Sequence, residues 1–165
     1  MRYVVHNHFP ARDNVGPQQD FVHAWVKAQS IDPLRYLEGL SKLTFVSDID
    51  NHWNASYTPD DDTVTVAAKF HGKTFSDKLQ TLLHEAGHRG QKVDKRTFEQ
   101  FKAQGLVKLS FFLEMANKAH RDDYDKNGIS PSEMADEIFA ESYSRFALGM
   151  EMPEPLRAFW ARRAL

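Results

Sequence analysis

The chain of 165 residues contains no cysteine. This absence excludes disulfide bonds, thiolate nucleophiles and every zinc or iron–sulfur site that is built on cysteine. Any metal site must therefore draw its ligands from histidine, aspartate and glutamate. The absence does not decide between an oxidising and a reducing compartment.

The chain also lacks a strong excess of charge and lacks long hydrophobic runs. Its 21 basic and 23 acidic residues give a net charge of -2, so no overall field concentrates nucleic acid or an acidic membrane around it. No apolar run approaches the ~18 to 20 residues that span a bilayer, and the N-terminus lacks the apolar region of a secretory signal. We therefore expect a soluble, cytoplasmic protein that binds neither nucleic acid nor a membrane.

The remaining composition is that of an ordinary globular protein, with 41% hydrophobic residues and no repeat or low-complexity tract. We expect one domain over residues 1–165, with an N-terminal helical part over residues 1–50 and a metal-site core over residues 57–148. In the N-terminal part, apolar spacing predicts a helix over residues 20–29 and a second helix from Pro33 to Leu43.

Apolar alternation predicts short strands at residues 43–46 and 63–70, where Val64, Val66 and Ala68 share one face. From Phe75 the apolar period changes to about 3.6 residues, which predicts a helix. The mixture of strands with these helices indicates an α+β fold.

The C-terminal half is predicted to be mostly helical. Residues 98–120 form a helical pattern that is broken at Gly105. Ser130-Pro131-Ser132-Glu133 is a capping box, so a helix should run over residues 131–148 and end at Gly149. A last short amphipathic helix is expected over residues 155–165.

The most informative motif is His84-Glu85-Ala86-Gly87-His88, which lies in the helix predicted after Phe75. Residues four apart project from one helical face, so both imidazoles can bind one Zn²⁺ ion at ~2.0 to 2.1 Å. Glu85 then lies near enough to contact a metal-bound water. Two histidines do not complete such a site, because catalytic zinc needs a third protein ligand and an open position.

Several acidic residues are candidates for the third ligand. A metzincin would have glycine and histidine where this chain has Gln91 and Asp94, so that branch is disfavoured and Asp94 is a weaker candidate. In the predicted helix over residues 131–148, Glu137 and Glu141 are four apart and share a face. Such a pair suits one metal ligand and one acid that supports a histidine ligand.

His84-Glu85-x-x-His88 followed by Glu137-x-x-Ala140-Glu141 resembles the gluzincin branch of zinc metallopeptidases, and most closely the anthrax lethal-factor-type protease domain. The resemblance implies His84, His88 and Glu137 as zinc ligands, Glu85 as general base and Glu141 as support behind the ligands. It implies a zincin-like fold, in which a small twisted sheet packs on the helix that carries His84 and His88, and a second helix supplies the glutamate ligand.

The same resemblance implies a zinc-dependent endopeptidase that hydrolyses peptide or protein substrates through a zinc-activated water. The strand over residues 63–70 matches the family's edge strand, so Val64, Val66 and Ala68 are expected to bind an extended substrate. The family has a tyrosine seven residues before the glutamate ligand, where this chain has Ser130. The nearby replacements as hydrogen-bond donor are Tyr124, His120 and Tyr143, and Tyr124 is preferred.

Two other functions remain open from the sequence. One is a non-catalytic protein-binding module that zinc stabilises, and the other is a zinc hydrolase that acts on a non-peptide bond. A structural zinc site is closed by four ligands and has no use for Glu85 beside the metal. The presence of Glu85 therefore favours an enzyme.

An acidic stretch before the last long helix resembles the start of an EF-hand calcium loop, with oxygen ligands at alternating positions. Its candidate calcium ligands are Asp123, Asp125, Asn127 and Glu133. The acid falls at the eleventh position of the loop, whereas an EF-hand has it at the twelfth. A simple turn before Ser130 is the preferred interpretation, and calcium binding is the alternative.

Overall fold

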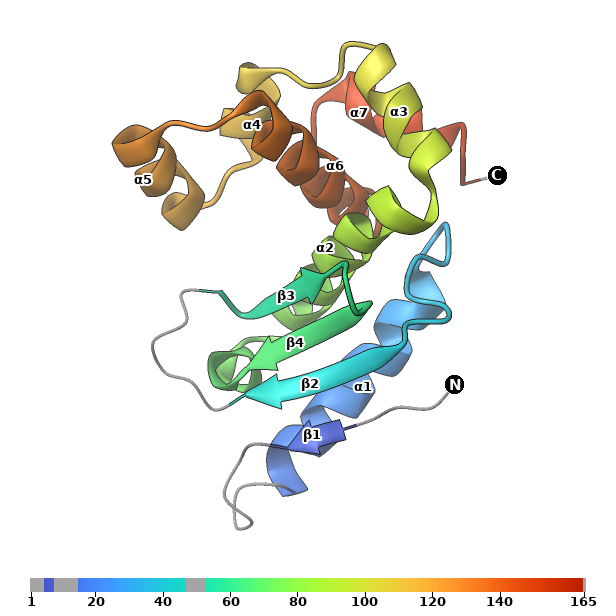
Figure 1. Cartoon of the computed structure of the whole chain (residues 1–165), viewed down its shortest axis with the longest axis vertical. Coiled ribbons are helices and arrows are strands. Elements are labelled where there is room, and N and C mark those ends of the chain that lie inside the picture. The colour runs from blue at the N-terminus through green and yellow to red at the C-terminus, as the bar shows by residue number, and fades with distance from the viewer. Residues whose placement is uncertain (1–4, 8–14, 47–52, 165) are drawn as a thin grey trace.

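In the computed structural model, the described strands and one long helix lie in the first part of the chain, and the part after the last strand is almost entirely helical (Figure 1). The structure describes residues 5–7, 15–46 and 53–164. The strands are β1 (Val5–Asn7), β2 (Lys42–Val46), β3 (Ala55–Thr58) and β4 (Thr63–Ala67). The helices are α1 (Val15–Ile31), the 3₁₀ helix η2 (Ala68–Gly72), α2 (Phe75–Val93), α3 (Lys95–Ala103), α4 (Leu109–Met115), α5 (Lys118–Asn127), α6 (Pro131–Leu148) and α7 (Glu154–Ala161). The α+β class that the sequence predicts is confirmed.

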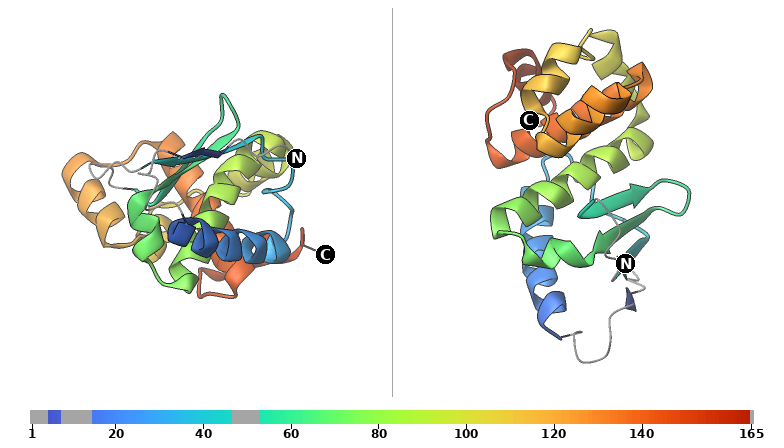
Figure 2. Two further views of the ribbon diagram at one scale, coloured as in Figure 1. Left: turned by 90° about the horizontal axis from the view of Figure 1, so that it is seen from below. Right: turned by 90° about the vertical axis from the view of Figure 1, so that its left-hand side faces the viewer.

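The described strands form one mixed sheet in the order β1-β2-β4-β3. β1, β2 and β4 run parallel, whereas β3 runs antiparallel to β4. Helices α1 and α2 lie on one face of this sheet (Figure 2), and the core includes Phe21, Phe45, Val66 and Leu82. Among the described strands, β3 pairs on one side only, so it forms an edge of the sheet, and it contacts α2.

Helices α3 to α7 lie beyond α2, on the far side from the sheet (Figure 1). Within this helical part, α6 packs along α2, and α7 adds Phe159 and Trp160 to the same core. The buried Trp160 indole donates a hydrogen bond to the Ser142 hydroxyl on α6 at 2.9 Å. No helix in the described ranges is long and apolar enough to cross a membrane.

The helices that carry the candidate ligands agree with the sequence prediction. α2 begins after Thr74, whose hydroxyl caps the helix. α6 begins after Ser130, whose hydroxyl caps it in the same way, and it ends at Gly149 with a left-handed φ of 66°. The break predicted at Gly105 separates α3 from α4. Local capping residues therefore define these helices, as expected.

The helix predicted from Pro33 is wrong, because turns replace it. Arg35 and Gly39 have φ values of 57° and 75°, which an α-helix does not contain. The Asp32 carboxylate accepts a hydrogen bond from the Leu37 N–H at 2.7 Å and closes a turn. The N-terminal part is therefore not simply helical, since it also contributes β1 and β2 to the sheet.

The strand predicted over residues 63–70 is shorter than expected and does not lie at the edge of the sheet. It ends before Ala68, which begins η2. β4 lies between β2 and β3, and its Val64 and Val66 are fully buried in the core. The turn at residues 59–62 folds the preceding segment back onto β4, so β3 becomes the edge strand. Val64, Val66 and Ala68 therefore do not form an open edge for a substrate, and that expectation is corrected.

Candidate metal centre

The close approach of α6 to α2 depends on the glycine inside the His-Glu-x-x-His motif. A Cβ atom at Gly87 would lie 2.5 Å from Ala140 Cα and 3.1 Å from its Cβ. Any larger residue at position 87 therefore forces the two backbones apart. The small pair Gly87 and Ala140 allows the crossing that brings Glu137 on α6 opposite His84 and His88 on α2.

A Gly87→Ala substitution should therefore weaken the site without changing any ligand. We expect zinc affinity to fall at least about tenfold, and stability to fall by about 1 to 3 kcal/mol, the usual effect of overpacking. Zinc competition with a chelator and thermal melting measure the two effects. Gly72→Ala is the matched control, because a Cβ there meets no atom within 4 Å. Wild-type zinc affinity in Gly87→Ala would show that the helix contact does not set the geometry.

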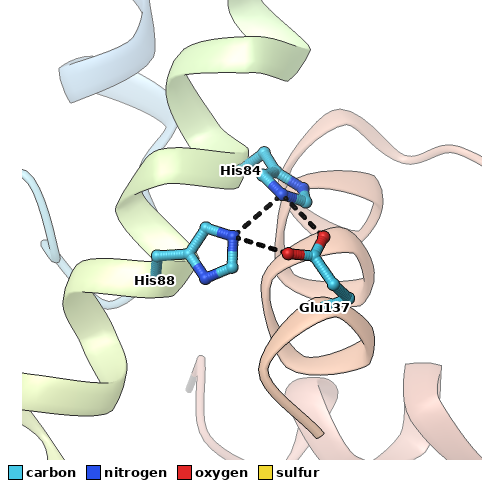
Figure 3. A group of neighbouring side chains, drawn as sticks. All are labelled: His84, His88 and Glu137. Atoms are coloured by element: carbon cyan, nitrogen blue, oxygen red, sulfur yellow. Dashed lines mark hydrogen bonds and ion pairs between the residues drawn. The ribbon is translucent and has the colours of Figure 1, made fainter. Parts of the chain in front are cut away.

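His84, His88 and Glu137 point toward one another from the two helices (Figure 3). The two histidine Nε2 atoms are 3.1 Å apart. The Glu137 carboxylate places one oxygen 3.3 Å from His84 Nε2 and the other 3.4 Å from His88 Nε2. Ligands held ~2.0 to 2.1 Å from a tetrahedral zinc ion are separated from one another by about 3.3 Å. The spacing of these three side chains therefore fits one Zn²⁺ ion.

The hydrogen bond behind His84 determines which of its ring nitrogens faces the centre. His84 Nδ1 lies 3.1 Å from Glu141 Oε2, and a carboxylate can only accept, so Nδ1 carries the proton. In the neutral ring, Nε2 then directs its lone pair toward His88 and Glu137. Burial alone would lower the pKa of His84, but the carboxylates of Glu137 and Glu141 raise it well above its usual value. The arrangement attracts positive charge to the point where the three side chains meet.

Glu141 is itself held in place by donors on both helices. Besides His84, it accepts hydrogen bonds from Gln80 Nε2 at 3.0 Å and from Arg145 Nε at 2.8 Å. Burial alone would raise the pKa of Glu141, but His84 and Arg145 lower it to about 2. An ionised Glu141 orients His84 from behind, in the supporting position that the sequence predicts. Gln80 and Arg145 were missed, although each lies four residues along its helix from His84 or Glu141.

Behind the second histidine lies an amide rather than a carboxylate. The side-chain nitrogen Nε2 of Gln91 lies 3.3 Å from His88 Nδ1 and donates a hydrogen bond to the Asp136 carbonyl at 3.0 Å. It thus connects α2 to α6 beside the candidate ligands. Asp94, the weaker candidate for third ligand, is used elsewhere: it accepts from the Tyr36 hydroxyl at 2.9 Å and caps α3.

Glu85 lies next to the three candidate ligands but is directed toward the sheet. Glu85 is only 6% exposed, and its carboxylate faces the backbone N–H of Tyr57 on β3. Burial raises the pKa of Glu85, which eases its acceptance of a proton. A buried carboxylate beside a metal centre is suited to act as a base.

An open cleft of about 1310 Å³ runs over these residues, between β3 and α2 on one side and α5 and α6 on the other. Its lining includes Ser56 and Tyr57 from β3, His84 and His88 from α2, His120 from α5 and Glu137 from α6. Residues of the sheet and of the helices therefore line the cleft together with the three candidate ligands.

The three candidate hydrogen-bond donors lie at different positions relative to the cleft. His120 lines the cleft beside Glu137. Tyr124, the preferred candidate from the sequence, is on α5 and does not line the cleft. The centre of its ring lies 6.1 Å from the centre of the Phe112 ring. Tyr143 is buried on the far side of α6, where its hydroxyl donates to Asp32. Of the three, His120 is the residue that the fold brings into the cleft.

The acidic stretch does not form an EF-hand-like loop. Asp123, Asp125 and Asn127 lie in the helix α5, and Asn127 Nδ2 donates to Asp123 Oδ1 at 2.7 Å. Helical residues two apart point in different directions, so they cannot surround one ion as alternating loop positions do. Glu133 lies in the next helix, and the turn that joins the two is confined to residues 128–130. Among the described residues, His84, His88 and Glu137 form the one group of three with metal-binding geometry.

No protein-family model matches the chain, and neither a curated protein nor a solved structure is significantly similar to it. The spacing of the motif and the geometry of the side chains therefore carry the functional argument.

Proposed function

We propose that the chain is a zinc-dependent endopeptidase of the gluzincin type. The observation that carries this proposal is the triangle of His84, His88 and Glu137, whose facing atoms are 3.1 to 3.4 Å apart with Glu85 beside them. Three protein ligands leave a fourth position of a tetrahedral zinc ion free for water or substrate. This arrangement supports an enzyme over a module in which zinc is only structural, because a structural site has four protein ligands.

In this proposal the residues of the chain divide the work of hydrolysis. A bound Zn²⁺ ion supplies the Lewis acid that polarises a water and the scissile carbonyl. Glu85 accepts the proton of the attacking water and passes it to the leaving amine, as a general base and then a general acid. His120, which lines the same cleft as Glu85, donates a hydrogen bond to the developing oxyanion in place of Tyr124.

The substrate in this proposal is a peptide that lies in the cleft in extended form along β3. β3 is the edge strand next to the centre, and its Ser56 and Tyr57 line the cleft. Main-chain hydrogen bonds to an edge strand hold many sequences, which suits an endopeptidase. β3 thus takes the role that the sequence assigned to residues 63–70.

Removal and return of the metal test the proposal. Metal-free protein should show no cleavage of a mixed peptide library by mass spectrometry, and stoichiometric Zn²⁺ should restore it. His84→Ala should abolish the restored activity, whereas His23→Ala on the exposed face of α1 should retain it. Zinc-loaded protein that hydrolyses ester substrates but no peptide would instead support the hydrolase of a non-peptide bond.

The same assay tests His120. His120→Ala should lower kcat by about 10²–10³-fold, the usual effect of removing one oxyanion donor, with zinc content unchanged. Tyr124→Phe is the control and should retain wild-type kcat, since Tyr124 does not line the cleft. The reverse ranking would return the donor role to Tyr124.

A further inference from the structure

A buried ion pair joins the helix of the metal centre to the hairpin that carries the edge strand. Arg89, which directly follows His88, places Nε 2.7 Å and its second terminal nitrogen 3.2 Å from the two carboxylate oxygens of Asp62. Its other terminal nitrogen donates to the carbonyls of Tyr36 and Glu38 at 2.6 and 2.7 Å. Arg89 is only 6% exposed. Its buried charge is compensated by the bidentate ion pair with Asp62 and by the two backbone carbonyls.

Asp62 in turn binds the edge strand. Its carboxylate accepts a hydrogen bond from the Tyr57 hydroxyl on β3 at 2.9 Å, and from the Ser41 N–H and hydroxyl at 3.0 and 2.9 Å. Asp62 has a φ of 51°, in the left-handed region that residues other than glycine enter at a free-energy cost. The contacts of Asp62 with Arg89, Tyr57 and Ser41 hold it in that conformation.

A second contact attaches the tip of the same hairpin to α2, because Lys92 Nζ donates to the Pro59 carbonyl. Glu85, Arg89 and Lys92 are spaced by four and three residues, so they lie on one face of α2. Arg89 and Lys92 bind the turn of the β3–β4 hairpin, and Glu85 faces Tyr57 of the same hairpin. The residue proposed as base and the residues that hold the hairpin therefore share one helical face.

We infer that Arg89 and Asp62 are positioning residues, which fix β3 on α2 and so keep Tyr57 of the edge strand beside Glu85 at the metal centre. The ion pair holds Asp62, Asp62 holds the Tyr57 side chain, and the backbone of the same tyrosine faces Glu85. Fixing β3 in this way also fixes the register of the edge strand relative to His84 and His88. The inference rests on the proposed peptidase function where it makes Glu85 the base, but the contact itself can be tested without activity.

Asp62→Asn is the informative variant. Asparagine keeps the size of the side chain and tolerates a left-handed φ, but it removes the charge that binds Arg89. Amide hydrogen exchange followed by NMR should show the Tyr57 N–H exchanging at least about tenfold faster than in the wild type. Tyr57→Phe removes only the hydroxyl contact and should cause a smaller change in the same direction. Asp61→Asn is the matched control, since it makes the same change in the same turn at an exposed residue.

Activity gives the second readout. Zinc-loaded Asp62→Asn should keep one zinc per chain but show about tenfold lower kcat/KM, with KM raised for long peptides more than for short ones. A merely structural loss would reduce the folded, zinc-binding fraction and leave KM unchanged. Unchanged exchange at Tyr57 in both Asp62→Asn and Tyr57→Phe would overturn the inference. A wild-type protein without peptidase activity would instead overturn the proposed function, while the exchange result would still decide whether the pair holds β3.

Discussion

A Glu85→Gln protein should bind zinc like the wild type and cleave peptides about 10²–10⁴-fold more slowly or worse. Glutamine matches glutamate in size, and its amide oxygen can still face the Tyr57 N–H. His84, His88 and Glu137 are untouched, so the metal-binding geometry remains. What the variant loses is the group that takes the proton from the attacking water. Steady-state kinetics and zinc content, measured on the same preparation, separate the two effects.

Glu99→Gln provides the control for this substitution, because Glu99 forms an exposed ion pair with Lys102 on α3, outside the cleft lining. It makes the same chemical change without reaching the centre, so its activity should equal that of the wild type. Near-normal peptide cleavage by zinc-loaded Glu85→Gln would contradict the mechanism, even if the metal site itself were correct.

Much of the helical framework could be predicted because its signals are local. Thr74 and Ser130 cap their helices, Gly105 and Gly149 end theirs, and the apolar period continues between these points. The helix predicted from Pro33 was wrong because residues distant in sequence decide the conformation of that segment. Arg89 binds the carbonyls of Tyr36 and Glu38, and Tyr143 binds Asp32 and the Leu34 N–H, all from helices distant in sequence.

The edge strand was missed for a related reason. β3 has only four residues, Ala55–Thr58, which is too short for an alternating pattern to stand out. The longer apolar run of β4 gave the stronger signal, yet a run that is buried on both faces belongs to an interior strand.

The residues of the candidate metal centre could be predicted because they form two pairs, His84 with His88 and Glu137 with Glu141. The members of each pair are four residues apart on one helix. The distance between the two helices could not be predicted from spacing alone, since it depends on the contact of Gly87 with Ala140. Spacing alone also could not decide which of the candidate hydrogen-bond donors lines the cleft. Tyr124 and His120 are on the same short helix, and only the packing of α5 against its neighbours decides which of them lines the cleft.

Glu137→Ala should abolish tight zinc binding, because it leaves His84 and His88 as the only ligands of the centre. Two imidazoles do not hold zinc as a catalytic site requires. The substitution also removes the carboxylate that, with Glu141, draws positive charge to His84. Zinc titration against a competing chelator should show the loss directly, and peptide cleavage should disappear at zinc concentrations that saturate the wild type.

Glu141→Ala should have a smaller effect, since Glu141 contacts the protonated side of His84 and not the face that meets the metal. Losing such a supporting group usually lowers metal affinity or activity about 10 to 100-fold. Arg145 and Gln80 would lose their shared acceptor at the same time, so some loss of stability should accompany it. Glu133→Ala, one turn before Glu137 on the same helix and exposed, should bind zinc normally. If Glu141→Ala lost zinc while Glu137→Ala kept it, the ligand on α6 would be one turn further along the helix than the geometry places it.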